Sequence, residues 1–254
     1  VIALNRPDKT PVIRHTTKWT ALSLAPEDEA HQIARIAFGK GCRNAIVIAA
    51  SGERGTRLLN AFQQSWSDLG GRIRGLQTLS DSFQRSMQLG QLLGSGLSDE
   101  RITSVKQAFD LPVDSRGRRR QDFECIFMLA PEPSAARAWR PLIIFHLSGE
   151  IPVYATSAIY DGQRDARNRD LNGVYFVEIP AVLDIDRSDR FSRLRALGAD
   201  ALSLAERWRQ MEMTEEATMR GQTGILKRRS DGSVVRVLKL AVFDSARVQS
   251  MDDS

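Results

Sequence analysis

Strand-length apolar runs that alternate with amphipathic helical segments are the feature that most limits how this chain can fold. The runs Ala45–Ala50 and Cys125–Ala130 contain no charged or hydroxyl side chain. Such runs are typical of strands that are covered on both faces, as in the interior of a parallel sheet. Because helical segments separate the strand-like runs, the sequence predicts an α/β fold in which helices pack on parallel sheets.

Apolar residues at helical spacing identify the covering helices. A first helix is predicted to begin at Pro26, because proline suits the first helical position and the acidic residues 27–29 favour the positive end of a helix dipole. Near the end of the chain, residues 224–243 and the Asp231-Gly232 turn predict a β-hairpin. The last long helix carries the most regular apolar stripe, which consists of Leu194, Leu197, Ala201, Leu204, Trp208 and Met211.

The composition is that of a globular protein, with 42% hydrophobic and 26% charged residues in 254. The chain has no apolar run near the roughly 20 residues that span a bilayer and no signal peptide, so we expect it to begin inside a longer protein. Its net charge of +5 favours a polyanionic neighbour, which could be nucleic acid, a membrane surface or cell wall. Cys42 and Cys125 lack the spacing of a metal or redox pair, and we interpret them as small buried apolar residues.

Residues that could catalyse a reaction or hold a metal ion are sparse. The histidines His15, His31 and His146 are not at ligand spacing with one another, with a cysteine or with a carboxylate. We interpret them as exposed or helix-terminal side chains. The sequence also lacks a G-x-S-x-G elbow, an HExxH motif and a phosphate-binding loop. It therefore predicts no catalytic residue, no metal site and no cofactor, and the protein is expected not to be an enzyme.

Two turns that follow predicted strands are candidate binding positions. Residues 51–55, Ser-Gly-Glu-Arg-Gly, open a helix where free backbone N–H groups can hold an anion, but their spacing is not that of a dinucleotide fingerprint. The glycines of this turn either serve only a tight bend or place a ligand contact at the mouth of a cleft. Tyr154, Ser157 and Tyr160 gather after another strand, where they either line a small-molecule site or make structural hydrogen bonds.

A basic run lies in the long connection between residues 94 and 122. It contains Arg116, Arg118, Arg119 and Arg120 and no interleaved aromatic residue for base stacking. The run is either a solvated loop or a docking site for an acidic protein surface or an anionic polymer. Nucleic acid is the least favoured partner, because no groove-binding or strand-binding motif accompanies the arginines.

Several segments, taken in order, resemble the LpoA family of penicillin-binding-protein activators. The resemblance covers almost the whole chain. Each segment alone is weak evidence for the family, and the specificity comes from the occurrence of all the segments in the expected order. The segments are residues 1–6, 21–30, 118–122 with 126–130, 152–157, 170–173 with 178–180, 196–201 and 221–224.

The resemblance implies a type I periplasmic-binding-protein-like fold, with two doubly wound α/β lobes joined by a hinge. Residues 25–174 would form the second lobe, residues 1–24 with 175–220 would form an incomplete first lobe, and residues 221–254 would form a C-terminal hairpin near the hinge. The family's N-terminal helical-repeat domain and its lipidated cysteine are not in this sequence. The resemblance therefore implies that the chain is a fragment, or that something absent here completes the first lobe.

The implied function is non-catalytic activation of a bifunctional peptidoglycan synthase through protein–protein binding. The protein would act in the periplasm, anchored to the outer membrane by a lipid that this chain lacks, and peptidoglycan itself is a second possible partner. The alternative function is a periplasmic solute receptor of the amino-acid-binding type, which would share the fold. The candidate residues of an interlobe cleft are Ser23, Ser51, Glu53, Tyr154, Ser157 and Tyr160.

Overall fold

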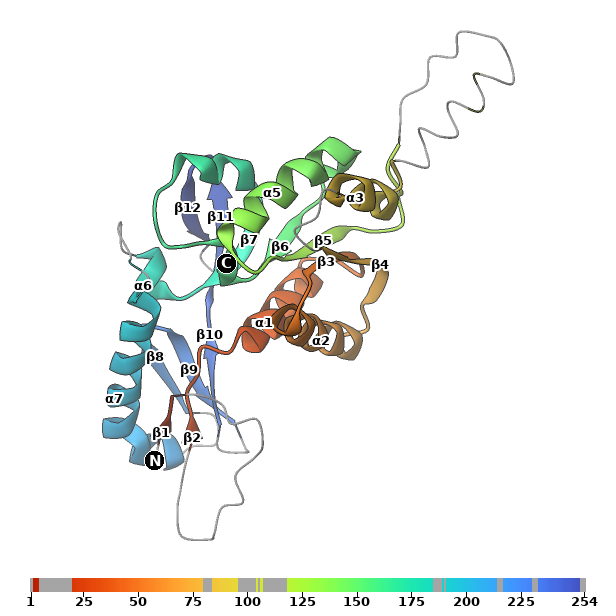
Figure 1. Cartoon of the computed structure of the whole chain (residues 1–254). Helices are drawn as coiled ribbons and strands as arrows, with labels where there is room; N and C mark the ends of the chain where they lie inside the picture. The colour runs from red at the N-terminus through yellow and green to blue at the C-terminus, as the bar shows by residue number, and fades with distance from the viewer. Residues whose placement is uncertain are drawn as a thin grey trace.

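The computed structural model describes residues 2–4, 20–79, 84–95, 104, 106, 118–184, 189, 191–213, 217–229 and 233–251. In this part of the chain a large sheet with its helices lies above a smaller assembly of α7 and short strands (Figure 1). The predicted α/β class is confirmed.

Seven strands form the large sheet, in the order β12-β11-β7-β6-β5-β3-β4. The strands β3 to β7 are mutually parallel, whereas β11 runs antiparallel to both β7 and β12. The fully apolar runs lie in the middle of the sheet, as their composition predicts. The bounds are β3 Asn44–Ala50, β4 Arg72–Leu79, β5 Cys125–Leu129, β6 Val153–Ala155, β7 Val174–Glu178, β11 Lys239–Asp244 and β12 Arg247–Met251.

Helices cover both faces of this sheet. Figure 1 shows α1 and α2 on one side, and α3 and α5 on the other. Helix α1 begins at Pro26 with three acidic residues in its first turn, as predicted. A π-helical turn, η1, extends α5, and the 3-10 turns η2 and η3 follow β6. The bounds are α1 Pro26–Gly39, α2 Glu53–Asp68, α3 Arg85–Leu93, α5 Pro133–Ile143, η1 Ile144–Ser148, η2 Ser157–Ile159 and η3 Ala166–Leu171.

The smaller assembly contains a two-stranded parallel sheet and a three-stranded antiparallel sheet, β10-β9-β8. Helix α7 packs on β8 and carries the predicted stripe, with Leu197, Leu204 and Met211 buried but Leu194 57% exposed. Leu197, Leu204 and Met211 form a separate small core with Leu22, Met219, Leu226 and Val234. The bounds are β1 Ile2–Ala3, β2 Thr20–Ala21, α6 Pro180–Leu183, α7 Ser192–Met213, β8 Thr218–Gly221, β9 Gly224–Arg228 and β10 Val234–Val237.

A buried carboxylate closes the turn between β8 and β9. Asp200 of α7 accepts hydrogen bonds from the backbone N–H groups of Gln222 and Thr223, both at 2.7 Å, and from the Thr223 hydroxyl at 2.5 Å. A Cβ atom at Gly221 would lie 2.4 Å from the Asp200 carboxylate. This close approach explains why a glycine stands at that position.

The two cysteines form a disulfide bond, which corrects the interpretation of them as separate apolar residues. Both are buried as expected, but the Sγ atoms of Cys42 and Cys125 are bonded across a sequence separation of 83 residues. The cause is strand pairing, because β3 lies beside β5 with Ala45 opposite Cys125, and Cys42 lies two residues before the start of β3.

The large sheet contains strands from both sides of the expected lobe boundary between residues 174 and 175. Residues 174–178 form β7, which pairs with β6 and β11 inside the large sheet. The C-terminal hairpin expected over residues 221–254 is instead shared between two sheets. The strands β9 and β10 form the predicted hairpin, and the chain then passes at Leu238 into β11 of the large sheet. The pattern of apolar residues in a strand does not show which strand it pairs with. The sequence therefore did not indicate that β7 and β11 lie side by side in the large sheet.

Candidate functional site

A buried polar network lies where the large sheet meets the smaller assembly. Ser157 lies two residues after the end of β6, and its backbone N–H and hydroxyl each donate to the Glu29 carboxylate of α1 at 2.9 Å. Both residues are less than 9% exposed. These bonds fix the first turn of α1 to the carboxyl edge of the sheet, because both acceptor oxygens of Glu29 are engaged by one residue.

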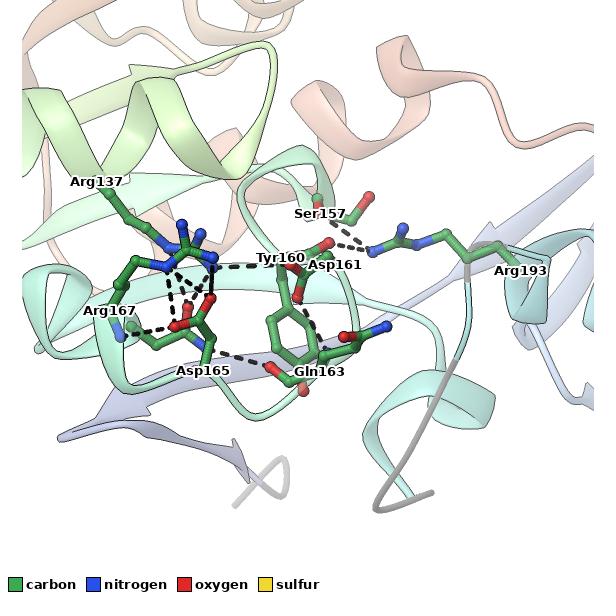
Figure 2. A network of polar contacts seen from close by, with 9 residues as sticks. Arg137, Ser157, Tyr160, Asp161, Gln163, Asp165, Arg167 and Arg193 are labelled. Atoms are coloured by element: carbon green, nitrogen blue, oxygen red, sulfur yellow. Dashed lines mark hydrogen bonds and ion pairs between the residues drawn. The ribbon is translucent and has the colours of Figure 1, made fainter.

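Arg193 links this edge to the start of α7. Its guanidinium forms an ion pair with Glu178, the last residue of β7, whose side chain has no exposed surface. The same guanidinium donates to the carbonyl oxygens of Ser157 and Tyr160, at 3.3 and 2.8 Å. Figure 2 shows Arg193 reaching from its helix to these two residues. A single side chain therefore ties α7 to the ends of both β6 and β7.

Arg236 adds a second link from the smaller assembly. It lies on β10, is 5% exposed, and donates through Nε to the Ser23 carbonyl oxygen at 2.8 Å. Its Nη1 and Nη2 atoms are buried without a hydrogen-bond partner in the described structure. Arg236 is nevertheless close enough to Glu29 and Glu178 for its charge to lower their pKa values. The network therefore contains two buried carboxylates and two guanidiniums.

Burial controls the titration of the two carboxylates. Loss of hydration and, to a smaller extent, the nearby negative charge of Glu178 raise the pKa of Glu29 to about 7. Arg236 and the two hydrogen bonds from Ser157 oppose this rise. Burial also raises the pKa of Glu178, while its hydrogen bond with Arg193 acts in the opposite direction. The protonation of Glu29 thus changes near neutral pH at the joint between the two assemblies.

The charged loop after β6 is tied down by a second set of ion pairs. Arg137 of α5 donates to the Asn168 side-chain oxygen at 2.7 Å and lies 3.7 Å from the Asp165 carboxylate. Arg167 pairs with the same carboxylate at 2.5 Å, as Figure 2 shows. Hydrogen bonds from Arg167 lower the pKa of Asp165 to about 2. The Asp165 carboxylate is therefore neutralised within the protein, and the loop is anchored to α5.

Three of the six candidate cleft residues lie at the network. Ser157 contributes its hydroxyl and backbone N–H, whereas Ser23 and Tyr160 contribute carbonyl oxygens. The Tyr160 ring contacts the rings of Phe176 and Phe243, which also stack on each other. For these residues the structure shows hydrogen bonds within the chain, which is the structural alternative left open by the sequence.

The other three candidates lie elsewhere. Tyr154 is buried in β6, where its ring stacks on Tyr175. Ser51 and Glu53 are exposed at the start of α2. In the same turn Gly52 has a φ of +93°, and a Cβ atom at Gly55 would lie 2.1 Å from the Ala50 carbonyl oxygen. The glycines of residues 51–55 therefore serve a tight bend and close packing of α2 on β3.

The basic run is partly engaged inside the protein. Arg120 donates to the Asp122 carboxylate at 2.6 and 2.7 Å and to the Arg74 carbonyl oxygen at 3.1 Å. The Arg119 guanidinium lies over the Phe123 ring at 5.4 Å from its centroid. Arg118 is exposed, and Arg116 lies outside the described residues. Arg120 is thus a packing residue, because its guanidinium holds the connection against β4.

His146 has a more specific place than its interpretation as an exposed or helix-terminal residue. It lies in η1, where Nδ1 is 2.7 Å from the Ser95 hydroxyl and Nε2 is 3.2 Å from the Ser86 hydroxyl. A Cβ atom at Gly90 would lie 2.9 Å from the ring. The imidazole therefore joins α3 to the end of α5. His31 lies on α1 as predicted, and His15 lies outside the described residues.

Sequence reasoning missed the charged members of the network. Glu29 was interpreted only as a charge at a helix N-terminus, and Glu178, Arg193 and Arg236 were not assigned a role. One signal was available, because Glu178 is a carboxylate in an otherwise apolar strand and such a residue needs a buried partner. The partners come from α7 and β10, and the sequence does not indicate which arginine is brought there.

The described residues contain no group of three or more His, Cys, Asp or Glu side chains placed to hold a metal ion. None of their helices is both long and apolar enough to cross a membrane.

Comparison with known proteins identifies the family. The family model described as "LppC putative lipoprotein" matches residues 1–246. The chain belongs to the LppC family. Among curated relatives of this LppC chain, penicillin-binding protein activator LpoA of Photobacterium profundum is 28% identical and LpoA of Vibrio vulnificus is 26% identical. The matches cover 96% and 89% of the chain, but only 42% and 39% of those relatives. The chain thus spans about two fifths of the length of these proteins.

Solved structures show the same fold. The C-domain of LpoA from Haemophilus influenzae, described as a regulator of PBP1A, matches with a TM-score of 0.69 and 21% identity, over 98% of this chain and 73% of that one. A "putative branched-chain amino acid ABC transporter" from Chromobacterium violaceum matches with a TM-score of 0.64 and 22% identity, over 95% and 72%. The LppC chain therefore has the type I periplasmic-binding-protein-like fold that the sequence resemblance implied.

Proposed function

We propose that this chain is a regulatory domain that binds a peptidoglycan synthase of the penicillin-binding-protein class and increases its activity. The observation that carries the proposal is the family match over residues 1–246, together with relatives named as penicillin-binding protein activators. Because the chain spans only part of those relatives, the proposal assigns to it the recognition of the synthase and leaves membrane anchoring to the complete protein.

The proposed mode of action is protein–protein binding without catalysis. The candidate cleft residues at the network bond to neighbouring parts of the chain, and the charged groups of the network link α1, β6 and β7 to α7 and β10. This arrangement supports a role as a joint between two lobes. We propose that the large sheet with its helices forms the second lobe, and that α7 with the two smaller sheets forms the incomplete first lobe.

The proposed location is the periplasm, with an outer-membrane lipid anchor on the complete protein. The lipoprotein family supports this location. The disulfide between Cys42 and Cys125 supports it independently, because structural disulfides persist in oxidising compartments such as the bacterial periplasm.

The test of this function is a reconstituted synthase reaction. The complete protein that contains this chain would be added to the purified bifunctional synthase of the same organism. Glycan polymerisation and peptide crosslinking would be followed over time. We expect direct binding and a faster rate of at least one reaction. Unchanged rates at saturating protein would overturn the proposal.

The basic run outside the packed Arg120 is the proposed docking position within this function. Reversing the charge of Arg116 and Arg118 leaves Arg120 and its bonds to Asp122 in place, so the variant tests docking by the rest of the run. We expect weaker synthase binding than in a control with the exposed Arg54 of α2 reversed. Equal affinity of the two variants would remove the basic run from the interface.

A second candidate function is a solute receptor, which the likeness to an ABC transporter protein favours. A receptor would gain stability from its solute, by roughly 2.7 kcal/mol at about 100 times the dissociation constant. A thermal-unfolding screen with amino acids would detect this gain. A saturable shift, together with unchanged synthase rates, would favour the receptor over the activator.

A further inference from the structure

A cationic pocket lies between helix α1 and the strands β9 and β10, next to the buried network, with which it shares Arg236. Its cavity volume is about 310 Å³, which is at the small end of ligand pockets in proteins. The walls come from both assemblies, since α1 covers the large sheet and β9 and β10 belong to the small one. The polar and charged lining residues are Asp28, His31, Gln32, Arg35, Lys227, Arg229 and Arg236.

The charge of this lining is strongly unbalanced. Three exposed cationic side chains, Arg35, Lys227 and Arg229, and one carboxylate, Asp28, line the pocket, so their formal charge is +2 with His31 neutral. Arg236 also lines the pocket, but its charge acts on the buried Glu29 and Glu178. Arg35, Lys227 and Arg229 are exposed at the pocket, and none of the three has a side-chain ion pair within the described part of the chain. Like charges held close together raise the free energy of the protein unless an anion neutralises them.

The pocket floor is built from well-fixed backbone. The Gln32 amide donates to the Leu238 carbonyl oxygen at 2.8 Å, and the Leu238 N–H donates back to Gln32 Oε1 at 3.0 Å. Leu238 is the residue at which the chain crosses from β10 to β11. The buried Arg236 is held by its bond to Ser23. The cationic side chains therefore extend from backbone that hydrogen bonds hold in place, close to the point where the chain passes from β10 to β11.

We propose that this pocket binds a small anion that carries two or more negative charges on phosphate or carboxylate groups. Guanidinium groups present paired N–H donors that match the oxygens of both groups, and Lys227 adds a point charge. A bound anion would contact α1 on one side and β9–β10 on the other. It would therefore strengthen the connection between the two assemblies. This inference stands independently of the proposed activation of a synthase.

The test is titration of the whole chain with two chemically distinct probes, inorganic pyrophosphate and citrate, by calorimetry at low ionic strength. We expect saturable one-to-one binding of at least one probe, weakened by added NaCl because salt screens the charges. Stronger binding of pyrophosphate would assign the site to phosphate, and stronger binding of citrate would assign it to carboxylates. Absence of saturable binding for both probes would overturn the proposal.

A pair of double variants separates the pocket from general charge attraction. Arg35→Gln with Arg229→Gln removes two pocket cations, and each lost charge-assisted contact should weaken binding by about tenfold. The control, Arg54→Gln with Arg209→Gln, removes the same charge from exposed positions on α2 and α7. We expect binding to be about 100-fold weaker in the first and unchanged in the second. Equal affinities for the two double variants would overturn the site, and Lys227→Gln provides an independent single-residue check.

Discussion

At the scale of single residues, the main physical feature is the burial of charged groups at the joint. A buried ion is tolerated only when opposite charges and hydrogen bonds replace its lost hydration. Glu178 obtains both from Arg193, which also holds two carbonyl oxygens. Glu29 obtains two hydrogen bonds from Ser157 but forms no direct ion pair with another residue in the described part of the chain. Its pKa is consequently raised towards neutrality.

Replacing Arg193 with alanine should destabilise the protein by about 3–5 kcal/mol, because the buried Glu178 then loses its partner. The free energy of unfolding in urea measures this loss. Arg195→Ala is the matched control, since that arginine lies two residues further along α7 and pairs with Asp189 at the surface. It should cause little or no loss. A small effect of Arg193→Ala would show that the joint does not depend on this pair.

The titration of Glu29 should make the stability depend on pH. In the folded protein its pKa is about 7, compared with an ordinary value of 4.5. Between these two pH values the folded state binds the proton and the unfolded state has released it, so stability falls as pH rises through this window. The raised pKa of Glu29 stabilises the folded protein by about 3 kcal/mol below pH 4.5. This stabilisation is lost above pH 7.

Glu29→Gln should remove that part of the pH dependence, because the amide keeps an acceptor for Ser157 and does not titrate. Urea unfolding at pH 5 and pH 8 would measure the difference between the variant and the parent protein. Glu53→Gln, which changes an exposed carboxylate on α2, is the control and should retain the parent's dependence. An identical pH profile for Glu29→Gln and the parent would contradict the assignment.

At the scale of elements, close approaches of the backbone decide where α7 and the small sheet meet. The Asp200 carboxylate occupies the space beside Gly221, and Gly224 has a φ of +125°. A Cβ atom at Gly224 would also lie 2.2 Å from the Val237 carbonyl oxygen. The segment Gly221–Gly224 is thus shaped by both its neighbour on α7 and its neighbour on β10.

Gly224→Ala should destabilise the protein by about 2–4 kcal/mol, because it combines a strained backbone with a clash against β10. Gly198→Ala is an informative counterpart, since Gly198 lies within α7 and a Cβ atom there would meet nothing within 4 Å. That substitution should stabilise the protein by roughly 0.5–1 kcal/mol through helix propensity. Thermal or urea unfolding of both variants tests the opposite signs.

At the scale of the whole molecule, two apolar cores of unequal size are joined by the polar network. The large core extends through the central strands β3, β5, β6 and β7 and their covering helices. The smaller core is built on α7, β2 and the three-stranded sheet. Because stability against local opening follows buried apolar contacts, the two assemblies should not be equally stable.

Amide hydrogen exchange should reveal this difference. We expect the amides of β8 and β9 to exchange at least about tenfold faster than those of β3 and β5, which corresponds to a difference of about 1.4 kcal/mol in opening free energy. Mass spectrometry of peptic fragments would measure both regions in one sample. Equal opening free energies would show that the two assemblies unfold as one cooperative unit.

The sequence by itself determined the class of the fold and most of its elements. The buried runs of β3 and β5, the start of α1 and the stripe on α7 were predictable because each depends on hydrophobic periodicity or on capping within one segment. The family resemblance, carried by ordered segments, was confirmed by the match over residues 1–246. That the candidate cleft residues line a cleft stays a prediction.

Only the tertiary structure decided which distant residues meet. The bond between Cys42 and Cys125 depends on β3 lying beside β5. The pairing of Glu178 with Arg193 depends on where α7 begins, and the cationic pocket depends on β9 and β10 lying beside α1. The physical reason is that the local pattern of apolar residues indicates which face of a segment is buried. Ion pairs, disulfides and pockets depend instead on which distant segment the chain topology places beside it.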